Sequence, residues 1–99
     1  MPYFLFLKNI FRWAAYRGDS DLFLKIIKER NLSPNVILDA EKNTALHYAA
    51  NFNHVKLAQD ISDLNVKGKK NALNWAPIHI ATFYNYKKIV KILSKNKIE

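Results

Sequence analysis

The sequence predicts an all-α protein, a solenoid of stacked helix–turn–helix hairpins, and three observations lead to that prediction. The segment 44–50 (TALHYAA) recurs as 76–82 (APIHIAT), with its histidine 32 residues further on. Apolar residues spaced three and four apart follow each copy, which is the pattern of one helical face. Two glycines and three prolines in 99 residues argue against a chain rich in loops.

A chain of 99 residues is long enough for one domain. Hydrophobic residues make up 49% of it, which is enough for a packed core. We therefore predict a single domain over 1–99. Its repeats are expected at approximately 8–38, 39–70 and 71–99, after an apolar N-terminal segment at 1–7.

The first predicted hairpin begins with a weaker copy of the motif at 9–15 (NIFRWAA). Its second helix is indicated by the apolar pairs at 22–23 and 26–27. Ser20 is expected near the start of that helix, where a hydroxyl satisfies a free backbone N–H. Asp19 and Asp21 favour the same end through the helix dipole.

The second and third predicted hairpins continue the period. Leu57, Ile61 and Leu64 follow the second copy, and the apolar pairs 89–90 and 92–93 follow the third. The turns between paired helices carry glycine or asparagine at the same place, namely at Gly18, Asn53 and Asn85. These residue types best tolerate the left-handed conformation in which helices often end.

Together these residues resemble the signature of the ankyrin-repeat family, which reads Thr-Pro-Leu-His, any residue, Ala-Ala, with a period near 33. The resemblance covers about residues 8–95. Asp39 and Asn71 fit the position that opens each repeat of the family. The signature residues that match are Thr44, Leu46, His47, Ala49, Ala50, Pro77, His79 and Ala81.

The resemblance implies structural roles for these positions. The alanines permit close stacking of neighbouring hairpins, and His47 and His79 tie adjacent loops by hydrogen bonds. Two family glycines are replaced, by Lys42 and Asn74, and Asp60 stands where an apolar residue is usual. We also expect the junction of the second and third repeats to be the least regular.

A partner-binding face is also implied by the resemblance, because in the family the loop tips and the inner-helix ends line a concave surface. Five of the twelve positions carried over from the family are aromatic, and such residues are frequent interface hot spots. The alternative is that some rings, Phe52 and Phe83 above all, fill gaps between repeats. The predicted partner-binding residues are Tyr16, Arg17, Glu41, Asn43, Asn51, Phe52, Leu73, Trp75, Phe83 and Tyr84.

The predicted function is protein–protein recognition: the concave face is expected to bind a partner that has an acidic rim around an apolar anchor. The 13 lysines, 11 asparagines and 10 isoleucines suggest AT-rich codons. The chain is in this respect similar to small ankyrin proteins that intracellular bacteria, protozoa or viruses direct against host factors. We accordingly expect an intracellular, cytoplasmic protein, one that such an organism would deliver into a host cell.

Charge suggests a second function, binding of nucleic acid or another acidic surface through the C-terminal third. Residues 66–99 hold eight lysines and one acid, whereas residues 1–65 are nearly balanced. A solvated face that keeps the protein soluble is the plainer interpretation. Arginine is scarce and the lysines are not interleaved with stacking rings, which disfavours nucleic acid.

Several classes of function are disfavoured. The chain has no cysteine, and its three histidines have no partner at metal-ligand spacing, so we predict no metal site. No glycine-rich phosphate loop or catalytic constellation is present, so we predict neither an enzyme nor a cofactor. No signal peptide or transmembrane segment is recognisable.

The two ends differ in polarity. Segment 2–7 is apolar where a repeat stack needs a polar end. We expect one of three explanations: the segment folds over the first repeat as a lid, it binds a partner or a second copy of the chain, or the whole chain is a remnant of a longer repeat array. The lysines of the last helix (Lys87, Lys88, Lys91, Lys95 and Lys97) are expected to face solvent.

Overall fold

Six helices make up the part of the protein that the structure describes. The computed structural model describes the backbone of residues 2–95 and the side chains of residues 7–95. No strand occurs between residues 2 and 95, so the all-α prediction is confirmed. The helices are α1 (Pro2–Arg17), α2 (Ser20–Arg30), α3 (Ala45–Phe52), α4 (Val55–Ser62), α5 (Pro77–Phe83) and α6 (Lys87–Lys95).

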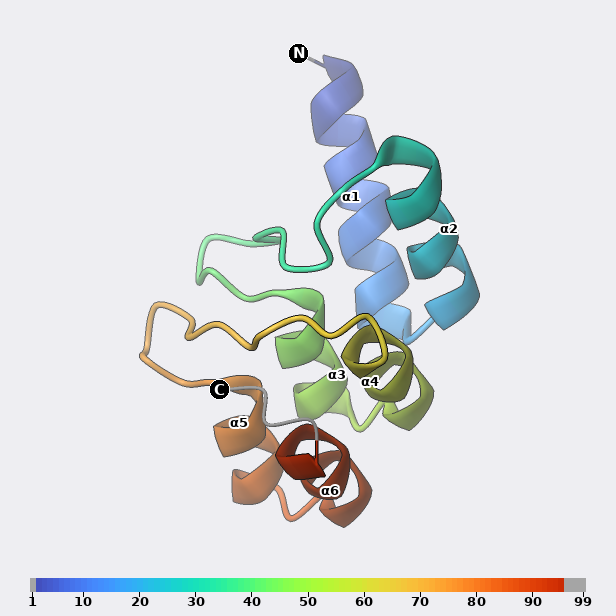
Figure 1. Ribbon diagram of the computed structural model, residues 1–99. Coiled ribbons are helices and arrows are strands. Elements are labelled where there is room, and N and C mark those ends of the chain that lie inside the picture. The colour runs from blue at the N-terminus through green and yellow to red at the C-terminus, as the bar shows by residue number, and fades with distance from the viewer. Residues whose placement is uncertain (1, 96–99) are drawn as a thin grey trace.

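The helices form two layers of a short stack (Figure 1). In one layer α3 packs between α1 and α5, and in the other α4 contacts both α2 and α6. The stack measures 38 × 25 × 20 Å. The two long loops, 31–44 and 63–76, project from the same side of the stack (Figure 1). Each helix pair therefore repeats the placement of the pair before it.

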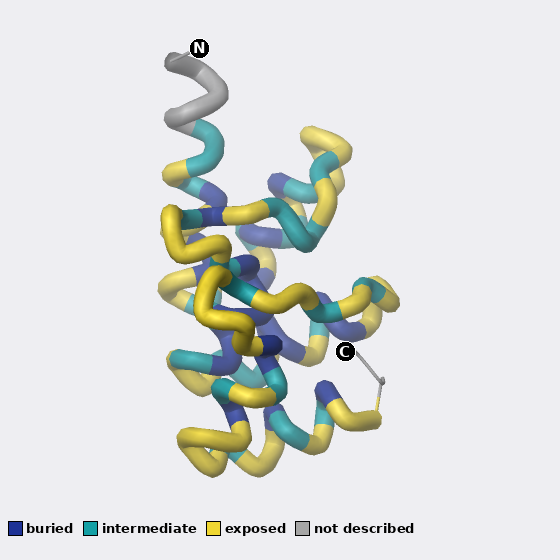
Figure 2. The backbone as a smooth tube through the Cα atoms, turned by 90° about the vertical axis from the view of Figure 1, so that its left-hand side faces the viewer, coloured by how far each residue is buried: buried dark blue, intermediate teal, exposed yellow. Residues whose placement is uncertain are grey.

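Alanines line the interior of the stack, where buried residues run along its axis (Figure 2). Ala14, Ala15, Ala49, Ala50 and Ala81 have no exposed surface. Such small side chains let helix backbones approach closely, as we predicted from the signature. Larger residues fill the space between layers: the rings of Phe11 and Phe23 stack at 4.3 Å between α1 and α2. Small side chains thus separate neighbouring inner helices, whereas large side chains separate the two layers.

The three turns within the hairpins share one backbone conformation. Gly18, Asn53 and Asn85 have φ angles of 73°, 58° and 59°, which lie in the left-handed region. The prediction from residue type is therefore confirmed at all three turns. Gly18 has a second reason to be glycine, because a Cβ there would lie 2.5 Å from Cγ of His54.

The loops adopt a left-handed backbone conformation at the two positions where the family's glycine is replaced. Lys42 and Asn74 have φ angles of 64° and 68°, which a glycine would adopt at no steric cost. Asparagine tolerates this conformation, whereas lysine bears a larger strain. The loop geometry is therefore set by its hydrogen bonds and not by glycine at these two positions.

The junction between the second and third repeats is more regular than we expected. The Nε2 of His47 donates to the carbonyl oxygen of Trp75 at 2.9 Å. The backbone N–H of Ala72 donates to the carbonyl of Glu41 at 2.8 Å, and the Asn71 amide donates to Asn43 at 2.9 Å. These three bonds align the second repeat with the loop 63–76, and the expected irregularity is wrong.

The start of α2 differs from the prediction. Asp19 is the capping residue, and its carboxylate accepts from the backbone N–H of Leu22. The buried hydroxyl of Ser20 donates instead to Asp60 on α4. Asp60 also accepts from Lys56, so the polar residue at this unusual position links two outer helices. Side-chain bonds from Lys56 and Ser20 hold the pKa of Asp60 below its usual value.

The N-terminal segment is part of the first helix. The backbone of residues 2–7 continues α1, whose first turns extend past α2 (Figure 1). A lid folded back over the first repeat is therefore wrong for this segment. The side chains of residues 2–6, like Lys97 at the other end, lie outside the described residues.

Candidate functional site: an aromatic groove

A groove follows the inner helices and the loops beside them. It consists of two hollows, of about 340 Å³ and 620 Å³. Both hollows are lined by Tyr16, Asp39 and Tyr48, so they adjoin. Ligand sites are typically concave and of this size.

Aromatic rings from two repeats meet in this groove. The rings of Tyr16 and Phe52 contact edge to face at 5.0 Å, across the boundary between α1 and α3. Tyr48 lies 6.2 Å from Phe52, and Trp13 lies 6.3 Å from Tyr16. Trp13 and Tyr16 are each about half exposed, at 55% and 51%. We call these four residues and the hollows beside them the aromatic groove.

Arg17 adds a positive charge beside the groove. Its guanidinium carbon lies 5.5 Å from the centre of the Trp13 ring, within the range of a cation–π contact. That contact orients an otherwise flexible side chain. Glu41 lines the hollow nearest Trp13 and contributes an exposed carboxylate there.

The Asp39 carboxylate anchors the loop at the bottom of the groove. It accepts from the backbone N–H of Asn43 at 2.9 Å, from the Asn43 amide at 3.1 Å and from the Tyr48 hydroxyl at 2.8 Å. Burial alone would raise its pKa, but these hydrogen bonds together hold the pKa of Asp39 below its usual value. Burial and the bond to Asp39 raise the pKa of Tyr48. Asp39 is thus ionised at neutral pH, with its oxygens occupied within the fold.

His47 ties the groove to the third repeat. Its Nδ1 accepts from the backbone N–H of Thr44 at 3.0 Å, while its Nε2 donates to Trp75. This pattern requires the neutral tautomer with the proton on Nε2. Burial is the main reason that the pKa of His47 lies below its usual value. The loop-tying role implied by the family is thereby confirmed for His47.

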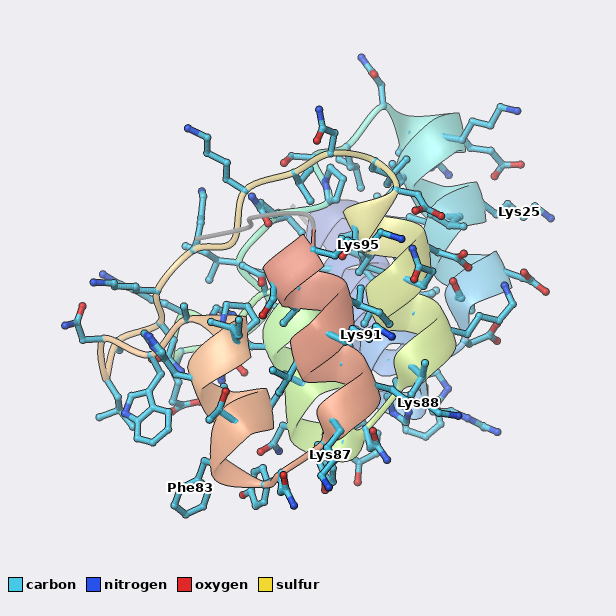
Figure 3. The ribbon with its side chains drawn as sticks, turned by 60° about the horizontal axis from the view of Figure 1, so that its bottom comes forward. Lys25, Phe83, Lys87, Lys88, Lys91 and Lys95 are labelled. Carbon is cyan, nitrogen blue, oxygen red and sulfur yellow. The ribbon has the colours of Figure 1, made fainter. Side chains whose placement is uncertain are left out.

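A second group of rings lies at the far end of the stack. Trp75 contacts Phe83 edge to face at 5.9 Å, Phe83 lies 5.1 Å from Tyr84, and Tyr84 stacks on Tyr86 at 5.4 Å. Phe83 is 69% exposed and projects from the end of α5 (Figure 3). We call these four residues the C-terminal cluster. Leu73, in the loop 63–76, is exposed as well.

The predicted partner-binding residues therefore divide into separate groups. Five of them line the groove, namely Tyr16, Glu41, Asn43, Asn51 and Phe52. Arg17 flanks it, Leu73 lies at a loop tip, and Trp75, Phe83 and Tyr84 form most of the C-terminal cluster. Phe52 and Phe83 are exposed, so neither ring simply fills a gap between repeats. Their part in binding stays a prediction.

Trp13 and Tyr48 belong to the groove although we did not select them. Trp13 lies three residues before Tyr16, and Tyr48 lies four residues before Phe52. That spacing places each on the same helical face as a selected residue. The sequence spacing could have identified both residues. It does so only if the predicted binding face includes one more turn of each inner helix.

The described residues contain neither a metal-binding constellation nor a membrane span. No three histidine or acidic side chains among them are grouped to hold an ion. No helix in residues 2–95 is both long and apolar enough to cross a bilayer.

Known proteins are similar to this chain over most of its length. The family model for ankyrin repeats (3 copies) matches residues 11–99. Glycerophosphocholine phosphodiesterase GDE1 of Candida albicans is 29% identical over 90 residues. That match covers 88% of this chain but only 8% of the Candida albicans protein. The phosphodiesterase activity of that protein is therefore not inferred for this chain.

The repeated motif, the paired helices and the family match agree. Ankyrin repeats are a non-catalytic fold whose members bind other proteins. This chain belongs to the ankyrin-repeat family.

Proposed function

We propose that the aromatic groove binds one partner protein, which inserts an apolar side chain among the rings. The observation that carries the proposal is the contact of Tyr16 with Phe52 at 5.0 Å, because it joins two repeats into one exposed aromatic surface. Aromatic residues present large contact areas at low cost in side-chain entropy. Residues of this kind dominate the affinity of many interfaces.

Charge at the edges of the groove favours an acidic rim on the partner. Arg17 is held at the Trp13 ring, and Lys42, Lys69 and Lys70 are exposed on the neighbouring loops. The carboxylates of Asp39 and Glu41 line the groove as well, but these four positive charges outnumber them. Such complementary charge mainly raises the rate of association and selects the partner.

The structure offers matched surfaces for a test. The chain carrying Tyr16→Ala and Phe52→Ala serves as the groove variant, and Lys25→Ala with Lys28→Ala on α2 serves as the control. A protein captured from eukaryotic cell lysate by the parent is identified, purified and titrated against each variant. We expect affinity to fall about 30-fold or more in the groove variant, as for a hot spot of about 2 kcal/mol.

Two results would count against the proposal. One is an affinity that the groove variant leaves unchanged while its helicity matches that of the parent. The other is recovery of nucleic acid and assorted acidic proteins alone, all released by salt. Trp75→Ala with Tyr84→Ala then shows whether the C-terminal cluster binds instead. That the protein acts on host factors, and that it is located in the cytoplasm, both stay predictions.

A further inference from the structure

The outward side of α6 carries four exposed lysines: Lys87, Lys88, Lys91 and Lys95 (Figure 3). Neighbours in this set are mostly three or four residues apart, so they lie along one helical face. At 1.5 Å per residue, the eight steps from Lys87 to Lys95 span about 12 Å. We call this set the lysine face.

The lysine face has no ion pair among the described residues. Lys56 on α4, by contrast, forms salt bridges with Asp21 and Asp60. No acidic residue occurs in α6. On the adjacent α4, the carboxylate of Asp60 is bound by Lys56 and Ser20. Directly after α4, the carboxylate of Asp63 accepts from Gln59.

The other outer helices carry acidic residues, which makes α6 different. Helix α2 mixes Asp21 and Glu29 with its three basic residues, and α4 pairs Lys56 with Asp60. Like charges three or four residues apart on a helix repel one another. An external anionic surface would remove that repulsion for α6.

Exposed aromatic residues lie beside the lysine face. Phe83 and Lys87 project at the same end of the α5–α6 hairpin (Figure 3). Tyr84 contacts Phe83 and is 47% exposed, so the apolar tip consists of more than one ring. Lysines beside exposed aromatic side chains are typical of surfaces that bind the headgroup region of a bilayer.

We propose that the lysine face and Phe83 bind peripherally to an anionic lipid membrane. The charge complements acidic headgroups, and each lysine near such a surface adds to the attraction. The face is the outer side of a helix, and neither groove hollow includes a residue of α6, so it suits a planar surface. Helix α6 has no arginine for paired bonds to nucleic-acid phosphates. Binding here is independent of the aromatic groove.

The test is co-sedimentation of the full chain with two kinds of vesicle, phosphatidylcholine alone and phosphatidylcholine with phosphatidylserine. We expect the chain to bind only vesicles with phosphatidylserine, and high salt to release it. Replacing Lys87, Lys88, Lys91 and Lys95 by Gln should weaken binding about tenfold or more. Phe83→Ser should weaken it less.

A charge-matched control separates a site from a general excess of positive charge. Replacing Lys25, Lys28, Lys67 and Lys70 by Gln removes the same charge from other surfaces, and Figure 3 shows Lys25 apart from the α6 lysines. This control should keep most of the binding. Equal losses in the two quadruple variants would overturn the proposal, as would equal binding to both vesicles.

Nucleic acid provides the last comparison. An oligonucleotide that binds the lysine face more tightly than phosphatidylserine vesicles do, at the same salt, would overturn the membrane proposal and favour the nucleic-acid function. Circular dichroism of every variant shows that a loss of binding is not a loss of fold.

Discussion

The same motif occurs in the second and the third repeat, but it makes different contacts there. His47 and His79 each accept a hydrogen bond from the backbone N–H three residues earlier, at 3.0 Å in both cases. His47 is buried and also bonds to the loop of the next repeat, whereas His79 is exposed. No further loop faces His79 within the described residues. The local cap is thus intrinsic to the motif, while the tie between repeats depends on a neighbour.

The last position of the motif, Ala50 in one copy and Thr82 in the other, also depends on whether a further repeat packs beside it. Ala50 is fully buried on α3, which packs between α1 and α5. Thr82, its equivalent 32 residues later, is exposed on α5. A departure from the family pattern therefore occurs where packing does not demand a small side chain.

The largest expected difference concerns the histidines. His47→Ala should lower the free energy of unfolding by about 2–3 kcal/mol, because it leaves the buried N–H of Thr44 without a partner and removes one of the two donors to the carbonyl of Trp75, the other being the N–H of Asn71. His79→Ala, which loses only the local cap, should cost about 1 kcal/mol or less. Urea titrations of both variants measure the difference. Equal losses would mean that the bond to Trp75 adds no stability.

A smaller difference is expected at the small residue. Ala50→Leu should destabilise the fold by about 1–3 kcal/mol through overpacking. Thr82→Leu should change stability by no more than about 0.5 kcal/mol, since its side chain faces solvent. Thermal midpoints provide the comparison. If Ala50→Leu is tolerated as well as Thr82→Leu, the inner helices are not closely packed at Ala50.

The smallest expected effect is a dependence on pH. The pKa of His47 is lower in the folded protein, mainly through burial, than its ordinary value of 6.5. The unfolded chain therefore binds the proton more readily, and the stability contributed by neutral His47 is complete above about pH 6.5 and lost as pH falls through the folded pKa. The thermal midpoint should fall from pH 7 to about pH 5, less steeply in His47→Gln than in His79→Gln. Parallel slopes would exclude His47 as the cause.

Much of the fold could be predicted because its signals are local and repeated. The capping and turn conformations depend on residue type, and Gly18, Asn53 and Asn85 recur at fixed places in the period. The burial of Ala49 and Ala81 likewise follows from a motif of a few residues. A single repeat would have given weak evidence, but the same pattern at a constant interval made it specific.

Contacts between repeats could not be predicted in the same way. The bond from Ser20 to Asp60 joins residues 40 positions apart, and nothing near Ser20 indicates it. Two rings of the groove, Tyr16 and Phe52, come from different repeats whose relative placement depends on the packing of α1 against α3. The helical course of residues 2–7 was missed because an apolar run alone does not distinguish a helix extension from a lid.

The contact between Gly18 and His54 has a mechanical consequence for the groove. His54 donates from Nε2 to the carbonyl of Tyr16 at 2.7 Å, and its ring occupies the space that a side chain at position 18 would need. Tyr16 and Phe52 lie just before these two turns, on either side of the same repeat boundary. A side chain at position 18 would force the His54 ring to move and would strain its bond to Tyr16. The bare backbone at position 18 thus leaves room for the bond that fastens the first hairpin turn to the second, directly beside the two rings of the groove.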